Sequence, residues 1–329
     1  MVIPTLAADS ALAACVSSLE RQTYQNFEVI VVDNSGNNRV RTMHFSFPRL
    51  RVIENTSNAG FGTAINQGWR ASDTRYVVTL NDDAVAEPGW LAAMVDAADR
   101  DPEIGLVACQ VRLSENELDS AGMLITRDGS TKQRGHGDPP AAWEKSEDVL
   151  MPSGSAALYR REMLDDTGGF ADDFFLYCED SDLGLRARRR GWRCRYVPEA
   201  VVYHAFSRTA GRASELKAFL VERNRLYLIV RNFPFRMLLR AFLAAPLRYL
   251  WHAAYLLQRR GKAAEFVQAG QKHTVLPAIV LRAHWHAAMR FRTLLAERRQ
   301  IRQRAYLTDN QFERLLAAHS ISLRELASL

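Results

Sequence analysis

Residues 76–84 read Tyr-Val-Val-Thr-Leu-Asn-Asp-Asp-Ala, and the rest of the chain can be placed around them. A β-branched apolar run ends here in Asn81, Asp82 and Asp83, and Pro88 follows shortly after. Such a run, bounded by turn-forming residues, is typical of a buried strand in an α/β sheet. Ligands of these sheets bind beyond the carboxyl ends of the strands. Two adjacent carboxylates there favour a hard divalent cation, although the same residues also form polar turns before helices.

The charge of the chain is unevenly distributed. Its 329 residues are 47% hydrophobic and 24% charged, which suits one large folded domain with an extension. Residues 233–329 carry sixteen Lys or Arg against five Asp or Glu, a net of +11, so the total of +6 leaves −5 for residues 1–232. We therefore expect a boundary at Asn232-Phe233-Pro234.

The cysteines and the hydropathy pattern indicate the cellular compartment of the protein. Cys15, Cys109, Cys178 and Cys194 are not spaced as metal ligands, and they predict reduced thiols. No signal peptide is visible after Met1, and no apolar run is long enough to span a bilayer. A cytoplasmic location is the resulting expectation.

A strand, a helix and a second strand are predicted before residues 76–84. They cover residues 2–5, 10–22 and 27–32. Together they predict a right-handed βαβ unit with parallel strands. Thr5 and Asp33 would stand at its carboxyl edge, where each can bond a base or a ribose. Taken singly, an Asp after a strand is often a turn residue instead.

A glycine-rich segment follows a short predicted strand at 51–54. Residues 58–68 read Asn-Ala-Gly-Phe-Gly-Thr-Ala-Ile-Asn-Gln-Gly. Small residues let the backbone approach a ligand, and a helix beginning near Gly62 would aim its amide dipoles at an anion. The spacing fits neither the Rossmann glycine pattern nor a Walker loop, and a simple chain turn is the alternative. The candidate ligand-binding residues in this segment are Asn58, Gly60, Phe61 and Asn66.

Three of these segments resemble parts of one known family. Residues 18–34, from Ser-Leu-Glu-Arg-Gln-Thr-Tyr to Val-Val-Asp-Asn, resemble the opening of family 2 glycosyltransferases of the GT-A fold. Residues 58–68 resemble that family's second donor loop, in its bacterial rhamnosyltransferase-like form. The D-x-D metal motif of the family corresponds to residues 81–83, where Asn81 replaces the first Asp, so the resemblance assigns the metal mainly to Asp83, with Asp82 beside it.

Two later segments extend the resemblance. Residues 151–161, Met-Pro-Ser-Gly-Ser-Ala-Ala-Leu-Tyr-Arg-Arg, are similar to the small-residue strand that enters the family's acceptor side. Residues 168–183, which include Phe-Phe-Leu-Tyr-Cys-Glu-Asp-Ser-Asp-Leu, resemble its acceptor loop and catalytic carboxylate motif. The resemblance thereby assigns to the acceptor side Gly154, Ser155, Phe175, Tyr177 and Glu179.

Asp180 is the candidate catalytic base, because the family gives that role to the Asp of this Glu-Asp pair. The pair opens a predicted helix that ends near Gly191, and the helix dipole would keep Asp180 ionised, as a proton acceptor must be. Asp182 lies roughly half a turn away around the helix and is a poorer candidate. On spacing alone, these carboxylates are equally well explained as an acidic first helical turn.

A predicted strand at 199–204 ends in His204, and the loop Ser207-Arg208-Thr209 follows. In related enzymes a His at this point can reach the metal or the diphosphate, so the resemblance adds His204 to Asp83 as a candidate ligand. A carboxylate with an imidazole suits Mn²⁺ or Mg²⁺ better than a softer metal. A lone His after a strand is also commonly structural.

The basic C-terminal region predicts amphipathic helices. Residues 233–257 are apolar and aromatic, with Arg236, Arg240 and Arg248 at helical spacing, which suits a helix in the headgroup layer rather than across it. Residues 290–304 add basic charge for anionic lipid. One candidate partner is the inner membrane surface, with the protein peripheral at its cytoplasmic face. The other is a helical subdomain packed on the body or on another subunit. Oligomerisation stays open, and no nucleic acid is expected because no recognition module is present.

The resemblance implies an α/β fold of GT-A type, with a Rossmann-like mixed sheet flanked by helices and a C-terminal helical extension. Residues 1–232 would form the catalytic domain, with a nucleotide-sugar half over about 1–110 and an acceptor half over about 111–232, and residues 233–329 the basic helical region. The implied activity is that of an inverting, metal-dependent glycosyltransferase. It would move a sugar from a nucleotide-sugar donor to a hydroxyl of a glycan or lipid-linked acceptor in cell-surface polysaccharide synthesis. Rhamnose from dTDP-rhamnose is the leading donor, with UDP-hexose or galactofuranose open.

Two other functions are weighed against this one. A sugar-1-phosphate nucleotidyltransferase shares the architecture, but Ala7-Ala8-Asp9 supplies no Gly- and Arg-rich loop after the first strand. A non-catalytic sugar-binding relative would be expected to have lost Asp83 or Asp180, and both are present. Release of nucleoside diphosphate from sugar nucleotides separates these functions.

Overall fold

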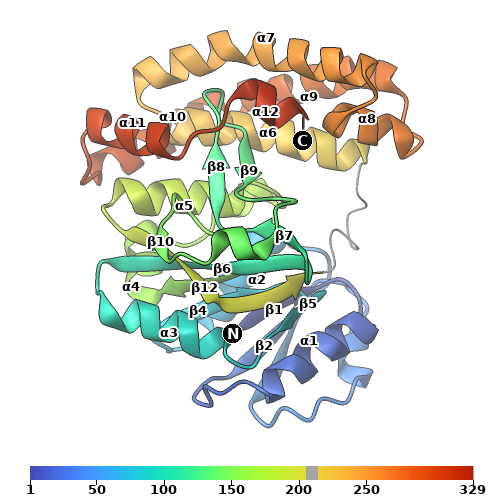
Figure 1. Cartoon of the computed structure of the whole chain (residues 1–329), viewed down its shortest axis with the longest axis vertical. Helices are drawn as coiled ribbons and strands as arrows, with labels where there is room; N and C mark the ends of the chain where they lie inside the picture. Colours follow the sequence, from blue (N-terminus) through green and yellow to red (C-terminus); the bar gives the residue numbers. More distant parts are fainter. Residues whose placement is uncertain (205–213, 329) are drawn as a thin grey trace. The chain divides into compact units, whose positions relative to one another are not determined.

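The computed structural model describes residues 1–204 and 214–328, and the loop expected at 207–209 lies outside them. These residues form two compact units (Figure 1). The first comprises residues 1–123 and the described part of 133–206, and the second comprises 124–132 and the described part of 207–329. Helix α6 (Glu215–Asn232) therefore groups with the C-terminal helices rather than ending the first unit as the composition suggested. The reason is that α6 packs against α9 (Leu276–Met289) and α10 (Phe291–Gln303).

The first unit is built on a mixed ten-stranded sheet. Its strands are β1 (Val2–Thr5), β2 (Val29–Asp33), β3 (Leu50–Glu54), β4 (Tyr76–Leu80), β5 (Ala84–Ala86), β6 (Ile104–Ser114), β7 (Glu117–Ser120), β10 (Glu147–Asp148), β11 (Ala156–Arg160) and β12 (Arg193–His204). Strands β4, β1, β2 and β3 are parallel, and β11 lies antiparallel between β4 and β6. Strand β12 pairs parallel with β6 and antiparallel with β5 and β10.

Helices cover both faces of this sheet. They are α1 (Ser10–Glu20) and α3 (Trp90–Arg100) on one face, and α2 (Phe61–Arg70), α4 (Arg161–Thr167) and α5 (Glu179–Arg189) on the other. Successive strand residues point to opposite faces, so Ile3 of β1 enters the first core and its neighbour Val2 the second. Short 3₁₀ helices lie at Arg39–Thr42, Pro140–Trp143 and Asp172–Phe174. The predicted βαβ unit and GT-A-like mixed sheet are confirmed, with element ends displaced by one or two residues.

Strand β12 is longer than the strand predicted at 199–204. It begins at Arg193 and passes through Pro198, where its register against β6 shifts. Proline has no amide hydrogen for the ladder, so the irregularity lets the strand continue beyond it. The strand ends at His204, which pairs with Ala84 of β5.

The second unit is helical. Besides α6, α9 and α10 it contains α7 (Phe235–Leu257), α8 (Gly261–Gln268), a 3₁₀ turn at His273–Val275, α11 (Asp309–Ala318) and α12 (Leu323–Ser328). It also includes most of the hairpin of β8 (Met123–Ile125) and β9 (Thr131–Gln133), whose Ile125 bridges to Ser320. The helix predicted over 233–257 is confirmed as α7. Within the described residues, none of the helices combines the length and apolarity needed to cross a membrane.

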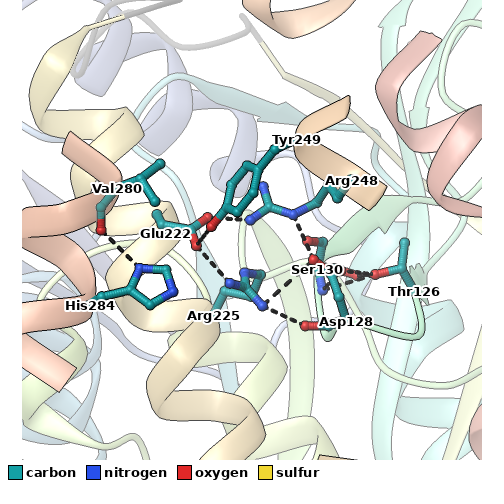
Figure 2. A network of polar contacts seen from close by, with 9 residues as sticks. All are labelled: Thr126, Asp128, Ser130, Glu222, Arg225, Arg248, Tyr249, Val280 and His284. Atoms are coloured by element: carbon teal, nitrogen blue, oxygen red, sulfur yellow. Dashed lines mark hydrogen bonds and ion pairs between the residues drawn. The ribbon is translucent and has the colours of Figure 1, made fainter. Parts of the chain in front are cut away.

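A buried ionic network joins the tip of this hairpin to α6 and α7 (Figure 2). Arg248 donates to Asp128 Oδ2 and to Glu222 Oε2, each at 2.6 Å. Arg225 donates to Glu222 Oε1 at 2.6 Å and to the Asp128 carbonyl at 2.7 Å. Arg248 was grouped with Arg236 and Arg240 from the sequence, but it faces inward, because two buried carboxylates require its charge.

Candidate active site

The carboxyl end of β4 is where the predicted donor and acceptor segments meet. Leu80, the last residue of β4, pairs with Ala156, the first residue of antiparallel β11. Asn81, which follows β4, is therefore a neighbour of Ser155, which precedes β11. The Asn81 N–H donates to the Ser155 carbonyl at 2.8 Å.

Asp83 and His204 form a close pair at this edge. His204 Nε2 lies 3.2 Å from Asp83 Oδ1 and 3.1 Å from Asn81 Nδ2. On the other side of the ring, Nδ1 lies 3.5 Å from Oδ2 of Asp119 on β7. Burial lowers the pKa of His204, but its contacts with Asp119 and Asp83 outweigh burial and raise it to about 9. The imidazole is thus held between two carboxylates.

Asp119 and its partner His136 were not predicted from the sequence. His136 Nδ1 lies 3.3 Å from Asp119 Oδ1, and the carboxylate is buried. Burial raises the pKa of Asp119, but His136 and His204 outweigh that effect and lower it to about 2. The signal in the sequence is weak, because it is a single Asp within a strand of four residues.

Asp82 turns toward β1. The Thr5 hydroxyl donates to Asp82 Oδ2 at 2.6 Å. Burial raises the pKa of Asp82 to about 6, the hydrogen bond from Thr5 opposes that rise, and the nearby charge of Asp83 adds to it. Thr5, Asp82 and Asp83 therefore lie together, as the sequence predicted.

Two other predicted donor-site side chains bond within their own loops. Asp33 is buried and accepts hydrogen bonds from the N–H groups of Ser35 at 2.9 Å and Val40 at 3.4 Å. Asn58 Oδ1 accepts from the Gly60 N–H at 2.9 Å. These contacts shape the loops that end at the carboxyl edge of the sheet.

Gly60 and Phe61 lie against the acceptor loop. The Phe61 N–H donates to the Phe175 carbonyl at 2.8 Å. Gly60 has φ of 89°, and a Cβ on it would lie 2.4 Å from that same oxygen, so only glycine fits. Asn66 is different: it is buried, and its amide exchanges hydrogen bonds of 2.8 and 3.0 Å with the Phe170 backbone. Because that amide is engaged inside the protein, we leave Asn66 out of the donor site.

Asp180 faces Gly154 from the first turn of α5. Its Oδ2 accepts from the Gly154 N–H at 2.9 Å, and its Oδ1 accepts from the Ser181 N–H at 2.6 Å. A Cβ at Gly154 would lie 3.1 Å from the Cβ of Asp180, so the small residue permits this approach. The helix dipole was expected to keep Asp180 ionised, but burial is the larger effect and raises its pKa, against the hydrogen bonds from Gly154 and Ser181.

The loop leading to Asp180 is strained. Phe175, Tyr177 and Cys178 have φ of 65°, 70° and 65°, a conformation that residues with a side chain rarely adopt. Such strain concentrates at ligand-binding sites. Glu179 follows, buried, and burial together with the charge of Asp180 raises its pKa to about 8. Glu179 Oε2 accepts no hydrogen bond from the part of the chain that the structure describes.

Asp182 belongs to the interior. It is fully buried, and its Oδ2 accepts from Arg186 Nε at 2.8 Å. Arg186 also donates to the carbonyls of Thr167 and Gly169 at 2.7 and 2.8 Å. Asp182 therefore holds an arginine that ties α5 to the end of α4.

Within residues 1–204 and 214–328, no group of three or more His, Cys, Asp or Glu is arranged to hold a metal ion. Asp83 and His204 still place a carboxylate oxygen and an imidazole nitrogen side by side. Once His204 Nε2 has given up its proton, that carboxylate and imidazole fit Mn²⁺ or Mg²⁺.

Comparison with known proteins identifies the family of the chain. Residues 1–227 match the family model described as "Glycosyltransferase like family 2". A relative in Mycobacterium tuberculosis, N-acetylglucosaminyl-diphospho-decaprenol L-rhamnosyltransferase, is 31% identical over 230 residues, covering 62% of this chain and 75% of that one. An O-antigen biosynthesis protein of Myxococcus xanthus is 28% identical over 240 residues, covering 67% of this chain but 18% of that one.

Solved structures show the same fold at lower identity. A mannosyltransferase from Pyrobaculum calidifontis, in complex with GDP-Man and Mn²⁺, has a TM-score of 0.55 at 20% identity and covers 92% of this chain and 84% of its own. GalNAc-T7, with UDP, GalNAc and Mn²⁺, has a TM-score of 0.57 at 14% identity over 70% of this chain and 47% of its own.

Proposed function

Because the chain belongs to the family 2 glycosyltransferases, we propose that it transfers a sugar from a nucleotide-sugar donor with inversion at the anomeric carbon. The observation that carries this proposal is a continuous line of contacts at one edge of the sheet. Asp180 accepts a hydrogen bond from Gly154, the next residue Ser155 bonds to Asn81, and Asn81 bonds to His204 beside Asp83. A candidate base and candidate metal ligands are thereby joined.

The donor would bind on the β1–β4 side of this edge. Thr5, Asp33 and the backbone of the Asn58–Gly60 loop are the groups that would contact the nucleotide. Asp83 and His204 would hold a divalent cation, with Asp82 close by. Two solved structures of the same fold contain Mn²⁺, which supports this choice of ion. When bound, such a cation neutralises negative charge on the leaving diphosphate.

Asp180 would act as the general base. The Gly154 and Ser181 N–H groups hold its carboxylate in one orientation, and both favour its charged form. Burial raises its pKa, which makes the carboxylate a better proton acceptor once it is ionised. It would take the proton of the acceptor hydroxyl as that oxygen attacks the anomeric carbon, while the nucleoside diphosphate leaves from the opposite face.

The acceptor is a lipid-linked sugar diphosphate and the donor is dTDP-rhamnose. The relative from Mycobacterium tuberculosis, a rhamnosyltransferase named for a lipid-linked acceptor, supports the acceptor and the choice of rhamnose, and the 58–68 loop supports the dTDP donor. The acceptor side comprises the backbone of Gly154 and Ser155, the aromatic residues Phe175 and Tyr177, and Glu179. The cysteines are present as thiols, which fits a reducing compartment, so we place the reaction at the cytoplasmic face of the membrane.

The test is release of nucleoside diphosphate and transfer of labelled sugar from a panel of dTDP-, UDP- and GDP-sugars, with Mn²⁺, with Mg²⁺ or with EDTA. We expect turnover with a lipid-linked N-acetylglucosaminyl diphosphate acceptor, dTDP-rhamnose as donor, and loss of activity in EDTA. Asp83→Ala should abolish metal-dependent turnover and the metal's enhancement of donor binding. A nucleotidyltransferase would release no nucleoside diphosphate from these donors, but with added pyrophosphate it would convert a sugar nucleotide to the nucleoside triphosphate and a sugar 1-phosphate. A non-catalytic relative would bind donor without turnover, and either result would refute the proposal.

A further inference from the structure

The outward face of α7 is apolar along its whole length. Leu243 is 81% exposed and Leu250 is 66% exposed. At 3.6 residues per turn, the exposed positions fall on one side of the helix, opposite the buried Leu238, Ala241 and Ala245. An exposed apolar surface of this extent marks a contact site. We call it the α7 stripe; its large members are Phe235, Leu239, Phe242, Leu243, Leu247, Leu250 and Leu257.

The segment of sequence that carries the α7 stripe is basic. Residues 233–264 contain six Lys or Arg and no Asp or Glu. Arg248 is turned into the buried network, and Arg236 lies exposed along one edge of the stripe. Arg240 lies on the same edge and pairs with Glu313 of α11 at 2.6 Å. Arg259 and Arg260 follow the end of the helix and are exposed. An apolar strip edged by cations is complementary to a bilayer surface that carries anionic headgroups.

We propose that the α7 stripe rests on a membrane surface containing anionic lipid, with the helix axis in the plane of the headgroups. Pro246 lies on the exposed face inside the helix and has no amide hydrogen, so the Phe242 carbonyl lacks its usual helical donor. Water can hydrate that carbonyl at headgroup depth, whereas the hydrocarbon core could not. The proline and the flanking arginines therefore set a shallow depth.

A bilayer fits the stripe better than a second copy of the chain. A symmetric dimer through this face would bury the same helix from both copies. Arg236 of each copy would then approach an apolar helix that brings no carboxylate of its own, whereas Arg240 already pairs with Glu313. Lipid phosphates supply the missing negative charge.

This inference rests on the proposed function for one consequence only. An acceptor diphosphate on a membrane-embedded lipid would be presented at the surface on which α7 lies. The stripe itself is argued from exposure and charge alone.

Two leucine-to-glutamate changes test the stripe in the full-length protein. The first protein carries Leu243→Glu and Leu250→Glu, and the control carries Leu216→Glu on α6. Leu216 is 59% exposed and lies outside the stripe, next to Glu215, so the control has a similar exposure and the same substitution. Because all three side chains are exposed, we expect folding to survive, which thermal unfolding checks.

Binding is measured by flotation with vesicles of phosphatidylcholine alone and with phosphatidylglycerol added. We expect the parent and the Leu216→Glu protein to float with the anionic vesicles, less so at high salt, because screening weakens the cationic contribution. The affinity of the double variant for these vesicles should be lower by about tenfold or more, because two apolar side chains that contact the bilayer are replaced by charged ones. Arg236→Gln with Arg260→Gln, both on exposed side chains, should reduce the preference for anionic vesicles.

Two results would overturn the proposal. One is vesicle binding by the double variant equal to that of the parent. The other is a parent protein that does not bind vesicles and is dimeric by light scattering, while the double variant is monomeric. The stripe would then be a dimer interface.

A second assay separates this inference from the proposed function. Transfer is measured to a short-chain, water-soluble acceptor diphosphate and to a long-chain acceptor in vesicles. We expect the double variant to keep the first activity and to lose most of the second. If no variant or parent transfers sugar while vesicle binding behaves as expected, the proposed function fails and the membrane surface stands. If the double variant transfers to the vesicle acceptor as fast as the parent, the α7 stripe has no role in reaching it.

Discussion

Asp180 and Asp182 stand two residues apart in α5 but have different surroundings. Asp180 is held by backbone N–H groups at the edge of the sheet, whereas Asp182 is fully buried against Arg186. Asp180→Asn keeps the shape of the side chain but cannot accept the acceptor's proton. We expect donor and metal binding to survive, the transfer rate to fall by roughly 10²–10⁴, and the unfolding temperature to change little.

The matched change Asp182→Asn should have the opposite profile. It replaces the buried carboxylate that accepts from Arg186 Nε at 2.8 Å with a neutral amide, so we expect a loss of about 3–5 kcal/mol in the free energy of unfolding. The rate of the remaining folded enzyme should stay near that of the parent. Chemical denaturation and single-turnover transfer assays measure the two effects separately. A stable but inactive Asp182→Asn beside an active Asp180→Asn would exchange the roles assigned here.

Asp119 Oδ2 faces the far nitrogen of His204, Nδ1, at 3.5 Å. Asp119→Asn replaces a carboxylate that faces the imidazole with an amide, so the ring loses the partner that holds its far nitrogen. We expect Mn²⁺ affinity, measured by calorimetry in the absence of substrate, to fall by about 10–100-fold. Asp138→Asn, an exposed carboxylate in the loop after β9, is the control. Unchanged Mn²⁺ affinity in Asp119→Asn would show that its contact with His204 is only structural.

Glu179 gives a pH dependence whose sign can be worked out. Its pKa is raised from an ordinary 4.5 to about 8 in the folded protein, mainly by burial. Between these values the folded state holds a proton that the unfolded state has released, so stability falls as the pH rises. Glu179→Gln removes this loss. The variant should match the parent near pH 4 and exceed it increasingly up to about pH 8 in unfolding experiments.

The control for this prediction is Glu162→Gln, on the exposed side of α4. Its difference from the parent at each pH is the baseline against which the Glu179→Gln difference is measured. A Glu179→Gln protein whose advantage is the same at every pH would mean that Glu179 ionises normally in the folded state.

At the scale of elements, the network of the second unit is the largest buried concentration of charge described above. Burial would raise the pKa of both Asp128 and Glu222, but Arg225 and Arg248 outweigh it and lower both. At pH values above the ordinary carboxyl pKa, the ionised forms of both residues therefore stabilise the fold. This stabilisation is lost as the pH falls below that value. We expect the second unit to open in acid before the sheet domain does, as hydrogen exchange of α6 and α7 would show.

Asp128→Asn tests the same network at neutral pH. Arg248 loses its 2.6 Å contact with Asp128 Oδ2 inside the protein, so we expect a loss of about 3–5 kcal/mol in unfolding free energy. Glu265→Gln breaks an exposed pair with Lys262 in the same unit and should cost about 1 kcal/mol or less. Equal stabilities of the two variants would show that Asp128 and Arg248 do not form a tight pair in solution.

Elements with strong local patterns could be predicted from the sequence. Strand β4 covers the apolar β-branched run at residues 76–80. Helix α7 begins at Phe235, two residues after the predicted start. The short strands β7 and β10 could not be predicted, because two to four residues carry no periodicity and their pairing is set by β6 and β12. Asp119 lies in β7 and could not be recognised as a site residue for the same reason. The buried position of Arg248 could not be predicted either, because its partner Asp128 lies 120 residues away in the chain.

At the scale of the whole molecule, the chain passes between the two compact units three times, at residues 123/124, 132/133 and 206/207. The basic C-terminal region is therefore not a simple appendage to a complete catalytic domain. Residues 124–132 come from the middle of the sheet domain's sequence but are folded with the helices. The charge and composition shift at residue 232 could not reveal this, because nine residues do not alter the composition of a region.

A chain ending at residue 206 would leave the 124–132 hairpin without its partners. Ile125 is buried and exchanges backbone hydrogen bonds with His319 and Ile321, and Asp128 pairs with arginines of α6 and α7. Removal of residues 207–329 would expose both the apolar side chain and an unpaired strand edge, which favours aggregation.

We expect the truncated chain to aggregate and to unfold at a lower temperature than the full chain. Co-expressed residues 207–329 should restore solubility and co-purify with it. Asp128→Asn in the truncated chain should weaken this co-purification, because the hairpin is then bound without its charge. A truncated chain that is monodisperse and as stable as the full chain would show that the hairpin folds independently of the helices.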